Sequence, residues 1–398
     1  MSRRGPQSSV RLGEAIDAAE LAEITRRLVR IDSTNPPGNE HAAATALVTI
    51  AQEAGLHAEL VPVGNGRSNA TVRLPGDGSD PRRLLYCGHL DTVVTGGDPW
   101  KYHPLGADVI DGEIWGRGSV DMKGGLAAML VALVALHRTG TRLSGEVVLA
   151  ATVGEEVDCV GARHLLATGG MDGVAWLVVG EPTGLDLVIA HKGCLRIRVT
   201  TRGVASHASR PELGRNAVLA MARLLPLLAD IDVSGVPHAL LTPSTIAPTL
   251  VSGGSAVNIV PDECSAEFDI RTGPEQSTDD LMSRFDAVAR RFGEDVANEG
   301  IDVTTELSYE RAPMQTPSDE LLVATFQRTF AEVTRRSCAP RGESYFTDAS
   351  ILQPPTAVPT LVFGPGDPSL MHQTNERVRI NDLLIASRVL AALPLALW

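Results

Sequence analysis

Two adjacent glutamates, Glu155 and Glu156, follow the apolar run Val147–Val153, and they form either a polar turn or a reactive pair. Neighbouring carboxylates repel each other, so one of them is disfavoured as a charge unless a cation or a shared proton offsets the repulsion. A polar strand end is the simpler interpretation of this stretch alone, because the loops of α/β proteins are commonly polar. The other chemistry-bearing residues of the chain must decide between the two.

Histidines and acidic residues recur at the ends of other expected strands. His89 and Asp91 follow one of these strands, and Glu181 follows another. Asp121 lies in a glycine-rich loop that opens an apolar helix, and His372 lies near the end of the chain. Each residue alone has an ordinary explanation as a turn residue, a helix cap or a surface histidine. Because ligands of open α/β sheets bind beyond the carboxyl ends of the strands, the set predicts one site with imidazoles and several carboxylates.

This combination of side chains is typical of a site for divalent metal ions. Imidazoles and carboxylates together suit zinc, cobalt or manganese. The carboxylates exceed the needs of a single catalytic zinc, which takes three protein ligands and a water. Two ions roughly 3.5–4 Å apart would use them, with one carboxylate between the ions and one left free as a base. We therefore expect that one glutamate of the pair Glu155–Glu156 binds metal and that its neighbour handles protons.

Five motifs, in the same order along the chain, resemble those of the M20 metallopeptidases, a family that includes acetylornithine deacetylase, succinyl-diaminopimelate desuccinylase and aminoacylase. The resemblance runs from about Leu28 to the C-terminus. A match of five ordered motifs is far more specific than any one of them. The motifs are GHLDTV at 88–93, GRGSVDMKGG at 116–125, GEE at 154–156, GEPT at 180–183 and MHQTNE at 371–376.

The resemblance implies a role for each of these residues. Asp91 would orient an imidazole ligand as a carboxylate outside the metal shell. Glu155 would be the general base, which takes a proton from a metal-activated water and returns it to the leaving amine. Two divalent ions would be bound, zinc first and cobalt or manganese as alternatives. The implied ligands are His89 and Glu181 on one ion, Glu156 and His372 on the other, and Asp121 between the two.

The resemblance also implies a lid domain that contributes to the site. His207, in GVASHAS, would reach the active site of a partner subunit and stabilise the oxyanion that forms during the reaction. Asn258 and Arg271 match lid positions that contact substrate, and an arginine can hold a carboxylate through two hydrogen bonds. From the residues alone, Arg271 could equally be a strand residue paired with a neighbouring acid. Outside the lid, the stretch that begins at Gly364 resembles a family loop near the substrate carboxylate, whose backbone N–H groups could also hold that carboxylate.

The expected secondary structure can position these residues. Strands alternate with helices up to about Lys192 and again after about residue 308, which predicts an α/β sheet covered by helices on both faces. Between these parts, LRIRVT at 195–200 alternates apolar and charged residues, as an antiparallel strand with one wet face does. We expect a catalytic α/β/α domain formed by 1–192 and 309–398, with an inserted α+β, ferredoxin-like lid and dimerisation domain at 193–308.

Composition limits the partners and the location of the protein. The formal net charge of −13 argues against nucleic acid or an anionic membrane as a partner. The five cysteines are scattered and contain no C-x-x-C pair, which favours reduced thiols in the cytoplasm. The first twenty residues have no apolar core, so we expect no signal peptide there. The longest apolar run, 126–136, is too short to span a membrane.

The leading hypothesis is a metal-dependent hydrolase that cleaves the amide bond of an N-acyl amino acid, as a deacetylase or desuccinylase does. The alternative within the family is a dipeptidase or carboxypeptidase that releases a C-terminal amino acid. A glycosidase that uses Glu155 and Glu156 is disfavoured, because adjacent residues point apart while the acid and base must flank one bond. A non-catalytic ligand-binding protein would be expected to lack the base, but Glu155 is present. In either family reading, the partner is a small molecule and a second copy of the chain.

Overall fold

The structure is a computed structural model that describes residues 12–398, apart from the side chain of Asn298. The segment in which we expect no signal peptide therefore lies mostly outside the described residues. The chain folds into two compact units. Unit 1 contains the described residues up to Ala190, together with Gln315–Gly342 and Thr347–Trp398. Unit 2 contains His191–Met314 and Glu343–Phe346, so it takes in short segments on the far side of the expected boundary at 308/309.

The larger sheet has a parallel centre, in which β3 pairs in parallel with β6 and β7, and β7 pairs in parallel with β17. Antiparallel strands extend it on both sides. All four central strands therefore end at the same edge. Along the sheet the order is β1 (His57–Gly64), β2 (Arg67–Leu74), β6 (Glu146–Thr152), β3 (Arg83–His89), β7 (Val174–Val179), β17 (Thr360–Val362), β8 (Leu187–His191) and β15 (Met314–Gln315), with β16 (Pro340–Glu343) paired to β8.

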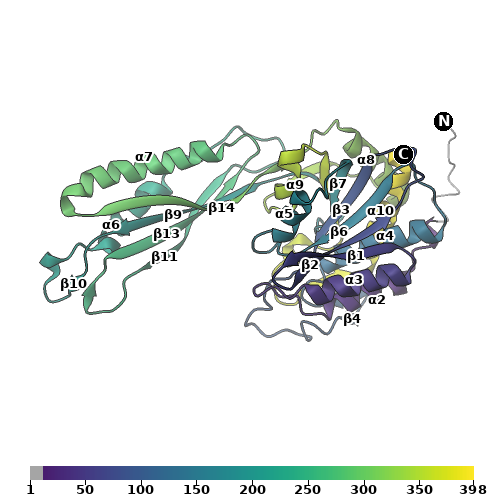
Figure 1. Ribbon diagram of the computed structural model, residues 1–398, viewed down its shortest axis with the longest axis horizontal. Helices are drawn as coiled ribbons and strands as arrows, with labels where there is room; N and C mark the ends of the chain where they lie inside the picture. Colours follow the sequence, from purple (N-terminus) through teal and green to yellow (C-terminus); the bar gives the residue numbers. More distant parts are fainter. Residues whose placement is uncertain (1–11) are drawn as a thin grey trace. The chain divides into compact units, whose positions relative to one another are not determined.

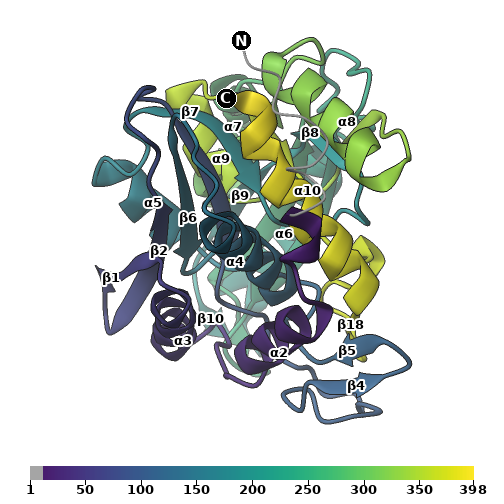
Figure 2. The ribbon, with the colours of Figure 1, turned by 90° about the vertical axis from the view of Figure 1, so that its right-hand side faces the viewer.

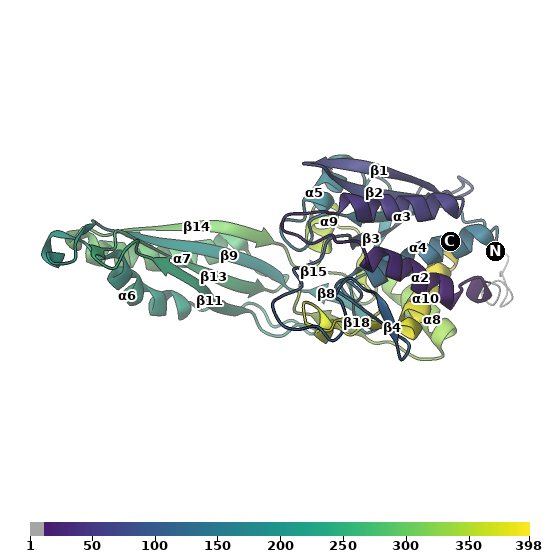
Figure 3. The ribbon, with the colours of Figure 1, turned by 90° about the horizontal axis from the view of Figure 1, so that it is seen from below.

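Helices cover both faces of this sheet, as the alternation of strands and helices predicted (Figures 1 and 2). On one face, α4 contacts β3 and β6 and also packs against α10, while α3 lies alongside β1 and β2 (Figure 3). On the other face, α5 and α9 contact each other. The helices are α2 (Ala18–Val29), α3 (His41–Glu53), α4 (Lys123–Arg138), α5 (Val160–Ala167), α8 (Leu321–Thr334), α9 (Ala349–Thr356) and α10 (Ile380–Leu397).

Two apolar helices form the centre of the core of unit 1. Residues 123–136 of α4 are all buried, which explains why this helix is apolar on every side rather than amphipathic. By length and composition alone, α10 could cross a membrane. It packs instead against α4, α8 and α2, and its Leu390 carbonyl accepts a hydrogen bond from the buried hydroxyl of Tyr86 at 2.6 Å. These neighbours are those of a core helix.

A small three-stranded sheet, which we did not predict, lies at one side of unit 1. Its order is β18 (Arg377–Arg379), β5 (Glu113–Trp115) and β4 (Asp108–Ile110). The pairing of β18 with β5 places Arg377 opposite Trp115. It thereby joins the segment that follows His372 to the segment that precedes Asp121, although the two lie about 250 residues apart in the sequence.

Unit 2 has the strand–helix–strand–strand–helix–strand order of a ferredoxin-like fold, which confirms the predicted fold class. Its antiparallel sheet has the order β11-β13-β9-β14. The elements are β9 (Gly193–Arg202), β10 (Ser206–His207), α6 (Ala217–Ala229), β11 (Thr245–Gly253), β12 (Ile259–Val260), β13 (Glu263–Thr272), α7 (Thr278–Val296) and β14 (Asp302–Arg311), with 3-10 turns at Pro211–Leu213 and Ala297–Glu299 and a further one in unit 1 at Pro368–Leu370.

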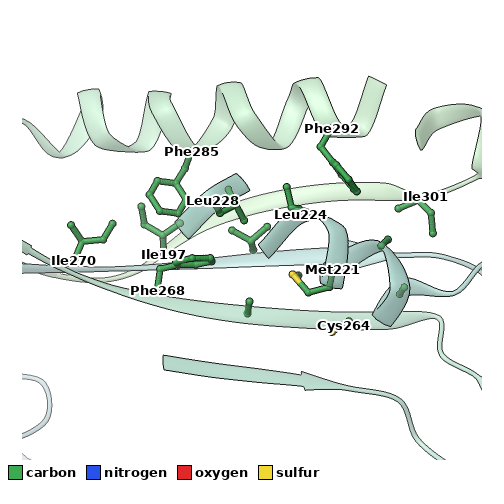
Figure 4. Packing of buried hydrophobic residues seen from close by; sticks show 14 of the residues in the cluster. Ile197, Met221, Leu224, Leu228, Cys264, Phe268, Ile270, Phe285, Phe292 and Ile301 are labelled. Atoms are coloured by element: carbon green, nitrogen blue, oxygen red, sulfur yellow. The ribbon is translucent and has the colours of Figure 1, made fainter. Parts of the chain in front are cut away.

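The core of unit 2 lies between its two helices and one face of its sheet (Figure 4). Phe285 of α7 packs edge-on against Phe268 of β13, with ring centroids 5.4 Å apart. Burial of each phenyl ring contributes about 1.5–3 kcal/mol to stability. The other face of the sheet carries ion pairs, such as the pair between Arg198 and Glu267. Unit 2 thus has a hydrophobic core of its own.

Candidate metal centre

The ends of the parallel strands bring together one group of potential metal ligands in unit 1. His89 is the last residue of β3, Glu181 follows β7, and Asp121 precedes α4. The Nε2 atom of His89 lies 3.0 Å from Asp121 Oδ1 and 3.5 Å from Glu181 Oε1. All three residues are buried, and their ligand atoms lie within 4.8 Å of one another. This geometry suits one cation held by an imidazole and two carboxylates.

A second group shares Asp121 with the first. The Nε2 atom of His372 lies 3.2 Å from Asp121 Oδ2 and 3.0 Å from Glu156 Oε2. Asp121 therefore presents one oxygen to each imidazole, as a carboxylate between two ions must. The side chain of His372 is 52% exposed, whereas those of Glu156 and Asp121 are buried. The residues that the resemblance names as metal ligands thus converge, and their binding of ions stays a prediction.

The carboxylates of this cluster need positive charge nearby. Burial raises the pKa of Glu181 to about 7, and the neighbouring charges of Asp121 and Glu156 add to the rise. Burial likewise raises the pKa values of Glu155 and Glu156 above their usual range. Buried carboxylates are stable as charges only when they are paired or coordinate a metal.

The imidazoles respond in the opposite sense to the same crowding. Hydrogen bonds to Asp121 and Glu156 raise the pKa of His372 to about 10. Burial opposes a charge on His89, but the carboxylates of Glu181 and Asp121 outweigh it and raise the pKa of His89 well above its usual range. The cluster thus favours cations at both imidazole positions, and its imidazole and carboxylate donors are those of a site for two hard-to-borderline divalent ions.

Glu155 is distinct from its neighbour Glu156. It is buried, and its Oε1 atom has no hydrogen-bond partner within residues 12–398. Because buried polar atoms are nearly always paired, an unpaired one marks a position where a water or a substrate is expected. His89 and Glu181 lie close enough to influence its pKa. Glu155 therefore has the position and the free oxygen that a general base requires, and that role stays a prediction.

A further acid, Asp348, lies beside Glu155. Its carboxyl, the thiol of Cys159 and the carboxyl of Glu155 have ligand atoms within 4.8 Å of one another, and all three residues are buried. Asp348 Oδ2 accepts a hydrogen bond from Thr152 Oγ1 at 2.5 Å. We did not single out Asp348 from the sequence, because it lies in none of the five motifs.

Asp91 contacts His89 mainly through its backbone. The Nδ1 atom of His89 lies 3.0 Å from the carbonyl oxygen of Asp91 and 3.6 Å from the carboxylate Oδ1. A backbone carbonyl is a common partner for a metal-binding histidine and fixes Nε2 as the free nitrogen. The expected orienting role of Asp91 is thus compatible with the structure, but its carboxylate has closer partners.

These partners lie in the loop that carries the two glutamates. The backbone N–H groups of Gly154 and Glu155 donate to Asp91 Oδ1 at 3.0 and 3.2 Å, and that of Glu156 donates to Oδ2 at 3.2 Å. Asn35 Nδ2 donates to Oδ2 at 2.9 Å. The carboxylate of Asp91 therefore fixes the turn that aims Glu155 and Glu156, a contact that the sequence could not reveal.

Gly364 supports the turn at Glu181. A Cβ atom added to it would lie 2.4 Å from the carbonyl oxygen of Gly180 and 2.5 Å from that of Glu181, so only glycine fits. Its N–H lies 3.3 Å from the Oγ1 atom of Thr183 and donates to it. The structure thus gives this glycine a packing role, and the expected contact of its N–H with substrate stays a prediction.

The remaining expected site residues belong to unit 2. His207 is exposed and pairs across β10 and β12 with Ile259, next to Asn258. Arg271 lies near the end of β13, where its Nε atom donates to Asp269 Oδ1 at 2.7 Å and its guanidinium lies 5.4 Å from the ring centroid of Phe346. The structure therefore shows the neighbouring acid as the partner of Arg271. His207 and Arg271 lie at opposite ends of this unit.

Comparison with known proteins decides the family. The model of peptidase family M20/M25/M40 matches residues 85–396. The chain belongs to this family. It is 33% identical over 368 residues to the succinyl-diaminopimelate desuccinylase of Cereibacter sphaeroides, with 90% of this chain and 93% of the relative covered. Membership makes the protein a metal-dependent hydrolase of the metallopeptidase and amidohydrolase class.

Solved structures share the fold of this family member. Human carnosine dipeptidase 1 aligns with a TM-score of 0.79 at 16% identity, covering 98% of this chain and 99% of that one. A dinuclear metal-binding M20 peptidase of Bacillus subtilis aligns with a TM-score of 0.69 at 15% identity, covering 96% and 98%. At identities this low, the alignments show a common fold. The fold classes predicted for the catalytic domain and for the inserted domain agree with this fold.

Proposed function

We propose that this M20 protein hydrolyses the amide bond of an N-acyl amino acid, releasing a carboxylate and a free amine. The observation that carries the proposal is the buried, unpaired Oε1 atom of Glu155 beside a carboxylate, Asp121, shared by two imidazoles. This arrangement provides a base next to a place for two cations. It leaves the glycosidase reading without a task for the imidazoles.

The proposed ligands are His89 and Glu181 for one ion, Glu156 and His372 for the other, and Asp121 for both. Divalent ions bound there would supply a Lewis acid and a more acidic water. In the proposed reaction Glu155 accepts a proton from the attacking water and returns it to the departing nitrogen. Asp91 holds the turn that aims Glu155, through the backbone of that turn.

The acyl group is proposed to be of the succinyl type, with acetyl as the simpler variant. The support is a relative at 33% identity, which is named a succinyl-diaminopimelate desuccinylase. A peptidase is the second candidate, since proteins with this fold include a dipeptidase. Arg271 would hold a carboxylate of either substrate after leaving its pair with Asp269.

A single experiment tests the reaction and the cofactor together. When a chelator removes the metal from the purified protein, its activity should fall about 10²-fold or more. About two equivalents of zinc, cobalt or manganese per chain should restore the activity. N-succinyl and N-acetyl amino acids and dipeptides are assayed side by side, and the metal of freshly purified protein is measured. We expect zinc, and we expect N-succinyl substrates to be cleaved fastest. Activity that survives complete metal removal would contradict the proposal.

The protein is further proposed to form a homodimer through unit 2. β11 ends the sheet of that unit and is exposed along nearly its whole length, with Leu250 59% and Val251 51% exposed. An exposed edge strand has free backbone groups that can pair with another chain. Dimerisation would also give His207 a role, because it could then reach the partner's active site.

The protein is also proposed to be located in the cytoplasm. The free cysteines and the absence of a disulfide in the described residues agree with this location.

The variant Val251→Lys tests this dimer. We expect wild-type protein to have twice the chain mass of 42.1 kDa in analytical ultracentrifugation and the variant to shift toward the monomer, with kcat reduced at least about tenfold. Val109→Lys, at an exposed position of β4, should change neither. A wild-type protein that sediments as a monomer and is fully active would refute the dimer.

A further inference from the structure

We propose that the buried ion pair between Arg117 and Glu376 is a positioning device that sets Asp121 against His372 before any ion binds. The Nη1 atom of Arg117 lies 2.6 Å from Glu376 Oε2, and their side chains are 3% and 0% exposed. The proposal rests on the proposed function, because it assigns to the pair the preparation of one of the two ligand groups. We call this pair, with its hydrogen bonds, the clamp.

Glu376 holds the loop that carries Asp121. Its Oε1 atom accepts hydrogen bonds from the backbone N–H groups of Val120 at 2.8 Å and of Asp121 at 3.1 Å. Its carbonyl oxygen accepts a third from the N–H of Gly116 at 2.9 Å. The Asp121 carboxylate, which is shared by the two imidazoles, is thus fixed through its own backbone by a residue four positions after His372.

Arg117 holds the loop that carries His372. Its Nη2 atom donates to the carbonyl oxygen of His372 at 3.3 Å, and its Nη1 atom donates to that of Gln373 at 3.3 Å. Nη2 also donates to the carbonyl of Val94 at 3.2 Å. Each partner of the clamp therefore comes from one ligand loop and fastens the other, so that the two loops are tied in both directions.

The backbone of His372 shows why such a tie is needed. Its φ of 61° lies in the left-handed region, which non-glycine residues rarely adopt. Such a conformation persists only where the surroundings over-determine it, and it is common at functional sites. Arg117 supplies that restraint, because it donates hydrogen bonds to the carbonyl oxygen of His372 and to that of the next residue, Gln373.

A purely stabilising role explains the pair less well. Buried ion pairs often contribute little net stability, because the cost of removing both charges from water offsets their attraction. Here the pair also satisfies backbone groups of two loops, at the point where Asp121 Oδ2 and His372 Nε2 lie 3.2 Å apart. Partners outside the metal shell typically change metal affinity by 10–100-fold, which is the effect expected of the clamp.

The variant Glu376→Gln tests the clamp. Glutamine can still accept from Val120 and Asp121, but its amide nitrogen then faces the guanidinium of Arg117 and the pair is lost. We expect affinity for the ion at Glu156 and His372 to fall about 10–100-fold, and affinity for the ion at His89 and Glu181 to change less than about threefold. Zinc titration calorimetry measures both.

A second readout needs no metal. In metal-free protein, the amide hydrogens of Val120 and Asp121 should exchange faster in Glu376→Gln than in wild type, because a neutral glutamine that is not held by Arg117 is a weaker acceptor than the paired carboxylate. Leu47→Ala, a core variant in α3, serves as the control for lost stability, and Glu146→Gln removes ion pairs with Arg73 and Arg83 at the start of β6, outside the clamp. Neither control should lower the affinity for one ion more than for the other. If Glu376→Gln does not fold, Arg117→Lys, which keeps the charge, should show the same selective loss to a smaller extent.

The outcomes separate this inference from the proposed function. Wild-type protein that fails to bind two ions refutes the function, and the exchange rates alone then decide on the clamp. Wild type that binds two ions, with a variant whose affinities and exchange rates are unchanged, overturns the clamp. An equal loss of affinity for both ions, as in a generally destabilised protein, also overturns the clamp. Selective weakening of the ion at His372 with faster exchange supports it.

Discussion

Replacing Glu155 with glutamine should lower kcat by about 10²–10⁴-fold while two divalent ions remain bound per chain. Glutamine has the size of glutamate but cannot take up a proton. The buried Oε1 atom of Glu155 has no partner in the described part of the chain, so the substitution removes no hydrogen bond seen there for that atom. Steady-state kinetics on the best N-acyl substrate, with metal analysis of the same sample, measures both quantities.

Glu59→Gln is the matched control, because it makes the same chemical change at an exposed position of β1. It should leave both kcat and metal content at the wild-type value. A Glu155→Gln enzyme with near-normal turnover would refute the assignment of the base. Loss of an ion in that variant would instead make Glu155 a ligand, in exchange with Glu156.

The convergence of the ligands could be predicted because it depends on strand ends. His89 and Glu181 come directly after apolar segments, and parallel strands deliver their carboxyl ends to one edge of a sheet. His372 was different, because it follows no central strand and the small sheet formed by β18 and β5 brings it to the site. The residue types alone grouped His372 with the other candidates, but its role as a ligand came from the resemblance of the five motifs.

Other features of the site lie in backbone contacts, which a sequence does not display. The resemblance implied Asp91 as a partner of His89, but its bonds to the N–H groups of Gly154–Glu156 depend on how β3 and β6 lie side by side. The pair of Arg117 and Glu376 was hidden for the same reason. Both residues stand inside quoted motifs, yet no local pattern joins residues 259 positions apart.

In unit 2 the fold class was predicted correctly, but the sequence did not reveal the long edge strand at Thr245–Gly253. The long edge strand is β11, whose sequence TIAPTLVSG contains a proline. Proline disfavours a strand prediction but is tolerated at an edge, where its missing N–H is not needed. Pro248 coincides with a register shift between β11 and β13, as such an edge position allows.

Replacing Asp121 with asparagine should weaken the binding of both ions, because the two carboxylate oxygens of Asp121 belong to different ligand groups. They lie 3.0 Å from His89 Nε2 and 3.2 Å from His372 Nε2. Asparagine keeps one carbonyl oxygen and no charge, so it cannot offset two cations. We expect each affinity to fall more than about 100-fold, since even partners outside the metal shell are worth about 10–100-fold. Activity at limiting zinc should then be lower than in Glu155→Gln.

The variant His372→Ala is the control that gives this prediction its force. It removes one imidazole and leaves the group of His89, Asp121 and Glu181 complete, so one ion should remain bound. Zinc content after dialysis at a buffered free concentration should therefore be near two in wild type, near one in His372→Ala and near zero in Asp121→Asn. An Asp121→Asn protein that retains one tightly bound ion would mean that the carboxylate belongs to a single centre. The two groups would then be independent sites, and a water held between two ions could no longer account for the chemistry proposed for Glu155.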